Sequence, residues 1–128
     1  MVPVGIYDSL SQDSVRFIIE KSDLKLIFAD HLSRVQTLID LQHEKSPLKM
    51  IITLYSPTKQ MIEQAKSKNL QLITYEELIN LGKENLIKPS PPSLHDLALI
   101  MFTSGSTGYP KGLINNKITR ISSFFFFF

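Results

Sequence analysis

One ten-residue segment of the chain has the residue types and the spacing to hold a polyphosphate. Residues 103–112 read Thr-Ser-Gly-Ser-Thr-Gly-Tyr-Pro-Lys-Gly and contain three of the five glycines of the chain. Because Gly105 and Gly108 can adopt backbone angles closed to other residues, the amide groups of this segment can converge on an anion. Hydroxyl side chains add neutral donors, and Lys111 adds a point charge suited to phosphate. The segment therefore predicts a phosphate-binding loop.

The spacing excludes two other phosphate-binding motifs. A Walker A loop needs Gly, four residues and then Gly-Lys-Ser/Thr, whereas here Gly105 is followed by Gly108, and Lys111 is followed by Gly112. The dinucleotide-binding pattern Gly-x-Gly-x-x-Gly is also absent. The alternative interpretation is a glycine- and serine-rich turn that binds no ligand.

The elements that must position this segment are predicted by apolar periodicity. Strands are predicted at Val2–Ile6, Leu24–Ala29, Leu48–Tyr55, Leu70–Ile73 and Leu97–Phe102, and helices between them, over about 11–21 and 32–44, then after Ser56 and after Thr74. This alternation predicts an α/β fold with a mostly parallel sheet flanked by helices. Ligand loops in such sheets follow the carboxyl ends of strands, and Thr103 directly follows the last predicted strand.

Local signals predict where the later helices begin and end. Ser56 followed by Pro57 predicts an N-cap with proline at the first helical position. Thr74-x-x-Glu77 predicts a capping box, and Gly82 predicts the end of the helix that follows it. The proline-rich stretch 88–93 predicts an extended connector.

Composition limits the classes of function. The chain has 128 residues, enough for one domain, and its 14 basic and 12 acidic residues are mixed, for a net charge of +2. The chain has no block of basic residues, so its sequence does not indicate nucleic-acid binding. The chain has no cysteine and only three scattered histidines, so neither a disulfide nor a metal site is predicted. No apolar run approaches the roughly 20 residues of a membrane-spanning helix.

The loop segment resembles a known family pattern. Residues 103–112 satisfy every position of Ser/Thr-Ser-Gly-Ser/Thr-Thr-Gly-x-Pro-Lys-Gly, the phosphate-binding loop of the AMP-forming adenylating enzymes. That superfamily includes acyl-CoA synthetases, firefly luciferase and the adenylation domains of peptide synthetases. A ten-position match after a predicted strand favours the ligand loop over the ligand-free turn. Weaker similarities at Val2–Leu10, at Tyr75–Leu78 and in the proline-rich connector favour the long-chain fatty-acid branch.

This resemblance implies the chemistry of a long-chain fatty-acid–CoA ligase. A fatty-acid carboxylate attacks the α-phosphorus of ATP, and CoA then displaces AMP from the acyl-adenylate; ATP, Mg²⁺ and CoA are the implied cofactors. The loop would hold the β- and γ-phosphates and stabilise their charge. The residues implied to bind ATP are Thr103, Ser104, Gly105, Ser106, Thr107, Gly108 and Lys111. No nucleophile, general base or metal ligand is implied within the chain.

The resemblance also implies that the chain is part of a larger adenylating-enzyme N-terminal domain. Residues 1–112 are expected to be a partial AMP-binding domain. Residues 113–128, which end in five phenylalanines, are expected to be a low-complexity tail foreign to the family, rather than a membrane or chaperone tag. The motifs Tyr-Gly-x-Thr/Ser-Glu and Thr-Gly-Asp are absent, so the chain alone is expected to be inactive.

Two alternatives to the long-chain ligase stay open from the sequence. One is an adenylate-forming ligase for a short-chain, aryl or amino acid, and the other is a non-catalytic α/β phosphate-binding module. A cytoplasmic location, or a peripheral one on the endoplasmic reticulum or peroxisome, is what the related ligases imply.

Overall fold

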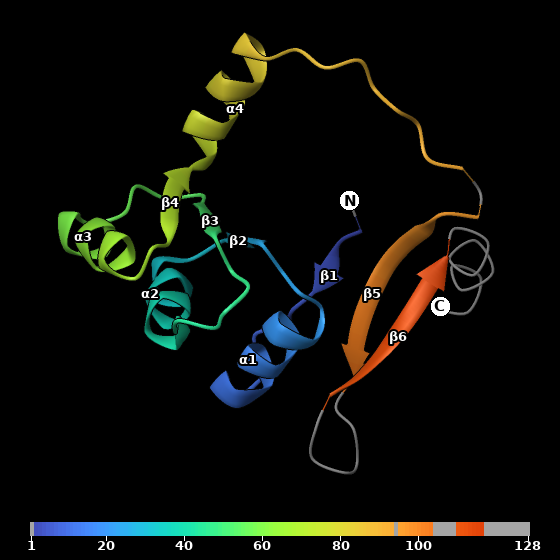
Figure 1. Cartoon of the computed structure of the whole chain (residues 1–128), viewed down its shortest axis with the longest axis horizontal. Helices are drawn as coiled ribbons and strands as arrows, with labels where there is room; N and C mark the ends of the chain where they lie inside the picture. The colour runs from blue at the N-terminus through green and yellow to red at the C-terminus, as the bar shows by residue number, and fades with distance from the viewer. Residues whose placement is uncertain (1, 94, 104–109, 117–128) are drawn as a thin grey trace. The chain divides into compact units, whose positions relative to one another are not determined.

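The chain divides into two compact units in its computed structural model, which describes residues 2–93, 95–103 and 110–116. One unit is formed by Ile19–Ile87, and the other combines Met1–Ile18 with Lys88–Phe128. The boundary falls inside helix α1 (Gln12–Lys21). Strands and helices alternate from β1 (Val4–Gly5) to β5 (Leu97–Thr103), as Figure 1 shows. The predicted α/β class is therefore confirmed.

The unit of residues 19–87 is built on a parallel sheet. Strands β2 (Leu26–Ala29), β3 (Met50–Thr53) and β4 (Gln71–Thr74) lie in the order β2-β3-β4. The central strand pairs in parallel with both neighbours, so that Ile51 lies between Ile27 and Leu72. Ile51, Ile52 and Thr53 are each at most 1% exposed. The apolar run in the sequence is thus a strand buried on both faces.

Helices α2 (Leu32–Leu41) and α3 (Lys59–Ser67) pack against this sheet and against each other. Their apolar faces supply much of the core of the unit; the buried residues are Val35, Leu38, Ile39, Leu41 and Ala65. After α3, the Lys68 ammonium donates a hydrogen bond to the carbonyl of Ile39 at 2.7 Å. A cation at the carboxyl end of α2 satisfies carbonyl groups that have no partner within the helix.

Two helices end in the same way although neither end carries a glycine. After α1, Leu24 N–H donates to Ile19 C=O and Asp23 N–H donates to Glu20 C=O. After α3, the corresponding bonds join residues 70 to 65 and 69 to 66. Asp23 and Asn69 have φ of 50° and 54°. These are Schellman motifs, and Asp and Asn are the non-glycine residues that best tolerate this left-handed backbone.

Three predicted helix boundaries are wrong. Thr58 rather than Ser56 caps α3, because its hydroxyl accepts the N–H of Met61 at 3.2 Å. Helix α4 (Tyr75–Glu84) continues through Gly82 and is capped by Asn85, whose side chain donates to Leu81 C=O; glycine in an exposed helix costs only about 1 kcal/mol.

The third wrong boundary is the end of α2, which stops at Leu41 rather than near residue 44. Gln42 takes an extended backbone with φ −66° and ψ 130°. Its side chain donates to the carbonyl of Leu48 at 3.2 Å. This bond holds the chain as it turns away from the helix toward β3.

The predicted capping box at the start of α4 is confirmed, and it should make the stability of this helix depend on pH. The Glu77 carboxylate accepts the Thr74 N–H at 2.6 Å and the Thr74 hydroxyl at 2.9 Å. These two hydrogen bonds, the backbone one foremost, lower the pKa of Glu77 below its ordinary 4.5. Stabilisation from a lowered carboxyl pKa is present above the unfolded pKa and is lost as pH falls through the folded pKa.

We therefore expect α4 to lose helicity selectively as the pH falls below about 4.5, in proportion to protonation of Glu77. Amide exchange and Cα chemical shifts along α4, followed by NMR, measure this loss. Glu77→Gln should remove most of the pH dependence, and Glu76→Gln should keep it, since Glu76 lies outside the capping box. Identical titrations of the wild type and Glu77→Gln would contradict the assignment.

The other unit contains a mixed sheet in the order β1-β5-β6. Strand β1 pairs in parallel with β5, and Val4 lies opposite Ile100. Strand β6 (Lys111–Asn116) pairs with β5 in the antiparallel sense and was not predicted from the sequence. The stretch 88–93 contains neither helix nor strand, as its prolines predict.

Candidate phosphate-loop site

The candidate loop is bracketed by a β-hairpin. Strand β5 ends at Thr103 and β6 begins at Lys111, and these two residues are register partners (Figure 1). The Thr103 hydroxyl lies 3.5 Å from the carbonyl oxygen of Lys111, at the long limit of a hydrogen bond. Residues 104–110 therefore connect two strands whose ends are held together.

Two of the seven predicted ligand-binding residues lie in the described part of the chain. Thr103 and Lys111 are both exposed, and the hairpin register brings them side by side. The other five, which are Ser104, Gly105, Ser106, Thr107 and Gly108, lie outside the described residues. Pro110, just before β6, is buried. An exposed hydroxyl and an exposed ammonium group thus face solvent at the mouth of the loop.

A close packing contact next to the loop fixes the hairpin. Phe102, only 5% exposed, lies opposite Gly112 in the register. A Cβ added to Gly112 would come within 3.3 Å of the Phe102 ring. Glycine at this position therefore lets the buried ring lie close to the β6 backbone, because a Cβ there would require the ring to shift by a few tenths of an ångström.

Replacing Gly112 by valine should weaken the hairpin, because the two added methyl groups must displace a buried ring. The Ile100 N–H binds Pro3 C=O on the β1 side, so the alternate amides of β5, such as Met101 N–H, face β6. We expect faster exchange of these amides, with the protection factor at Met101 lowered several-fold. Gly82→Ala is the matched control, since a Cβ there meets nothing within 4 Å and should stabilise α4 by about 1 kcal/mol. Unchanged exchange in β5 of Gly112→Val would show that the ring contact does not restrain the hairpin.

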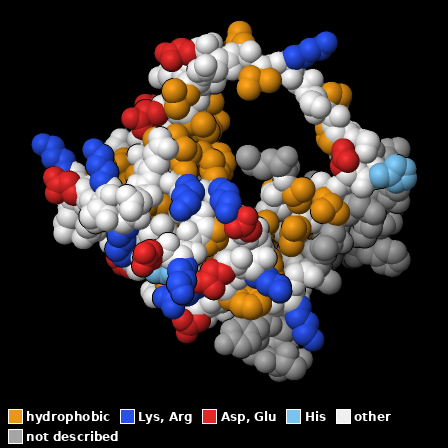
Figure 2. Space-filling view, viewed as in Figure 1, with side chains coloured by type: hydrophobic (Ala, Val, Ile, Leu, Met, Phe, Trp, Pro, Cys, Tyr) orange, Lys and Arg blue, Asp and Glu red, His pale blue; other side chains and the backbone are white. Residues whose placement is uncertain are grey.

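All three histidines are exposed, and His31 and His43 make local contacts. His31 lies 3.0 Å from the Ser33 hydroxyl through Nδ1, and its ring meets Tyr55 edge-to-face. His43 Nε2 lies 3.0 Å from a Glu20 carboxylate oxygen. Among the described residues, no three His, Cys, Asp or Glu side chains are grouped so that they could hold a metal ion. On the face shown in Figure 2, basic and acidic side chains are interspersed.

A comparison with known protein families shows the family to which the chain belongs. The sequence profile of the AMP-binding enzyme family matches residues 1–117, which include every strand and helix described above. The chain belongs to the AMP-binding enzyme family. The resemblance inferred from residues 103–112 is thereby confirmed, and the match continues through β6 to the residue after Asn116.

Curated proteins similar to this AMP-binding chain include long-chain-fatty-acid–CoA ligases. It is 36% identical to long-chain-fatty-acid–CoA ligase 1 of Cavia porcellus and 32% identical to the Homo sapiens protein of the same name. Each alignment covers 97% of this chain but only 18% of the relative. The chain therefore spans about a fifth of the length of the ligases that it matches.

A solved structure supports the same fold. The adenylation domain of a carboxylate reductase from Mycobacterium chelonae superposes with a TM-score of 0.77 at 19% identity, over 91% of this chain and 20% of that one. This likeness confirms the α/β architecture.

Among the described residues, no helix is long and apolar enough to cross a membrane.

Proposed function

We propose that the chain is the ATP-phosphate-binding portion of a long-chain fatty-acid–CoA ligase, in which ATP and a fatty acid form an acyl-adenylate that CoA converts to a thioester. The observation that carries this proposal is the hairpin of β5 and β6, which brackets the complete ten-residue loop pattern. The ligase names of the relatives at 30% to 36% identity support the substrate class.

In this proposal, the loop contributes charge stabilisation and positioning and no bond-making group. Thr103 and Lys111, at the ends of the two strands, would contact the phosphate chain from either side of the loop, and residues 104–108 would supply hydroxyl and amide donors. Mg²⁺, when bound with ATP, would neutralise part of the same phosphate charge. Interactions that strengthen as the pyrophosphate leaves would accelerate adenylation.

We further propose the division of the chain that the sequence suggested, with a partial AMP-binding domain at 1–112 and a low-complexity tail at 113–128, which is supported by the five phenylalanines that end it. Gly112 is the second residue of β6, so the first residues after that boundary complete the strand that closes the hairpin. A location in the cytoplasm or on an intracellular membrane also belongs to the proposal. It is supported by one relative named as the peroxisomal long chain acyl-CoA synthetase 7 of Arabidopsis thaliana.

A chimera tests the function. Residues 2–112 replace the matching segment of the complete Cavia porcellus ligase, and palmitate-dependent ATP–pyrophosphate exchange is measured. We expect exchange within about tenfold of the parent, because the fold of the segment and its loop are retained. The 128-residue chain alone is expected to give no exchange, because the family motifs Tyr-Gly-x-Thr/Ser-Glu and Thr-Gly-Asp are absent from it. A folded chimera without exchange, or exchange by the chain alone, would contradict the proposal.

A further inference from the structure

Within the described part of the chain, no strand pairs with the outer edge of β4. Strand order places β4 at an edge of its sheet, and Gln71 N–H donates to Lys49 C=O, on the β3 side, at 2.9 Å. Because successive residues of a strand face opposite sides, Leu72 and Thr74 direct their N–H and C=O groups to the open edge. The Thr74 N–H already binds the Glu77 carboxylate at 2.6 Å. Leu72 is thus the residue in β4 with both backbone groups available.

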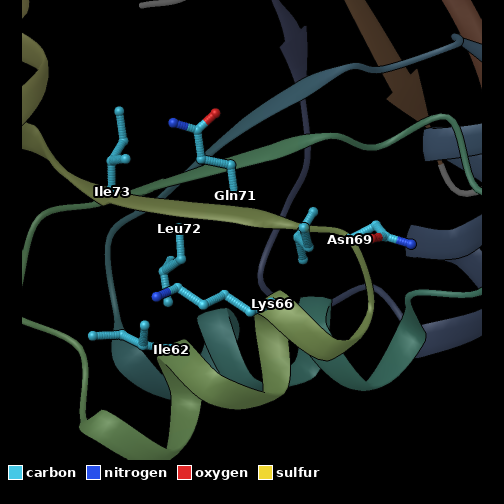
Figure 3. A pocket seen from close by; sticks show the side chains of 7 residues that line it. Ile62, Lys66, Asn69, Gln71, Leu72 and Ile73 are labelled. Atoms are coloured by element: carbon cyan, nitrogen blue, oxygen red, sulfur yellow. The ribbon is translucent and has the colours of Figure 1, made fainter.

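A groove runs beside this edge of β4. It has a volume of about 450 Å³ and lies between β4 and α3, lined by Ile62, Lys66 and residues 69–73. In Figure 3, Leu72 points toward α3 and the Lys66 side chain runs beneath it, whereas Gln71 and Ile73 point to the other face of the sheet. The strand reads Gln-Leu-Ile-Thr, so none of the lysines, prolines or bulges that usually protect an open edge is present.

We propose that this edge joins two copies of the chain through antiparallel pairing of β4 with β4. A two-fold axis beside Leu72 places that residue opposite Leu72 of the second copy. In such a hydrogen-bonded pair, each residue donates its N–H to the carbonyl of the other. The two leucine side chains then lie on the α3 face, where they and Ile62 fill the two grooves. The result is one continuous six-stranded sheet.

Charges on α3 favour a second copy over an unrelated strand. Glu63 and Lys66 lie one turn apart on α3, are exposed, and make no ion pair within the described part of the chain. The two-fold axis makes the two α3 helices antiparallel across the joined grooves. Each copy therefore brings Lys66 to the level of Glu63 of the other copy. The surface is complementary to itself, as a two-fold contact requires.

Charge reversal tests the pairing with the full 128-residue chain. In sedimentation velocity over a dilution series, we expect the wild type to show a concentration-dependent monomer–dimer equilibrium. Lys66→Glu places two neighbouring glutamates, at 63 and 66, on this side of α3, and Glu63→Lys leaves only lysines there, at 59, 63 and 66. Each variant alone should dimerise about tenfold or more weakly, because like charges then face each other. An equimolar mixture of the two variants should dimerise at least as well as the wild type.

A backbone variant ties the recovered dimer to β4. Leu72→Pro removes the outward N–H and no bond to β3, and proline is tolerated at such edge positions. Introduced into the Lys66→Glu chain, it should abolish dimerisation with Glu63→Lys, whereas Leu72→Val, which keeps the amide, should preserve it. Circular dichroism reports whether each variant is folded. A monomeric wild type, single variants that dimerise like the wild type, a mixture that stays monomeric, or a folded Leu72→Pro chain that still pairs would each overturn the proposal.

Discussion

Replacing Lys111 by alanine in the chimeric ligase should lower kcat/KM for ATP about ten- to a hundredfold. Lys111 is exposed at the first position of β6, opposite Thr103, and hydrogen-bonded register holds it at the mouth of the loop. A charge-assisted hydrogen bond contributes about 1.5–3 kcal/mol, and each 1.4 kcal/mol of lost transition-state stabilisation is tenfold in rate. The loss should fall mainly on kcat, because the phosphate charge rearranges as pyrophosphate leaves.

Lys88→Ala in the same chimera is the matched control. Lys88 is an exposed lysine in the connector, where no strand or helix positions it, so its replacement should leave the rate of pyrophosphate exchange within about twofold. Lys111→Arg should restore part of the activity, because arginine keeps the charge but not the compact ammonium geometry. If Lys111→Ala and Lys88→Ala have the same kinetics, Lys111 is an ordinary exposed lysine at the start of β6 and does not bind the phosphates.

Replacing Ile51 by alanine should lower the free energy of unfolding by about 2–5 kcal/mol. Ile51 is 0% exposed and lies in the central strand, between Ile27 and Leu72 of the two neighbours. Truncation removes buried methyl groups and leaves a cavity that the two flanking strands cannot fill. Urea unfolding followed by circular dichroism measures the change, and an unchanged slope with denaturant concentration would show that the loss is in stability.

Leu86→Ala is the control for the loss of unfolding free energy expected in Ile51→Ala. Leu86 is 89% exposed, so removing the same kind of side chain there should change stability by no more than about 0.5 kcal/mol. A similar loss in the two variants would mean that the sheet β2-β3-β4 is not the cooperative core of its unit.

The elements predicted best from the sequence are those whose signal is both local and redundant. The run Met50–Leu54 is apolar and rich in β-branched residues at once, and the structure places β3 within it. Thr74 and Glu77 form a reciprocal cap that depends on four consecutive residues, and it is present. Ser56 and Thr58 are both good caps, however, and the choice between them depends on where α3 must lie to bury Ala65. Local propensity does not contain that information.

The sequence alone suggests which residues form the candidate loop, but it does not predict the hairpin of β5 and β6 that brackets them. The ten-residue pattern indicated a loop after a strand, and β5 does precede it. Strand β6 was missed because Lys-Gly-Leu-Ile-Asn-Asn has few β-favouring residues. Its formation depends on pairing with β5 across residues 104–110. Antiparallel pairing of Thr103 with Lys111 is a long-range property, and periodicity within either segment does not encode it.

Helix α4 buries none of its residues, and Leu86 and Ile87 just beyond it are 89% and 87% exposed. Leu78 is half-buried, but no side chain of α4 is fully buried. Opening this helix therefore exposes little apolar surface, and we expect its resistance to opening to come mainly from its own hydrogen bonds and its cap. Strand β3, by contrast, is buried and paired on both sides, so we expect its amides to exchange only when the whole unit unfolds. A protease should accordingly make its first cut in α4 or in the connector that follows it, and leave an N-terminal fragment that still contains the sheet β2-β3-β4 with α2 and α3.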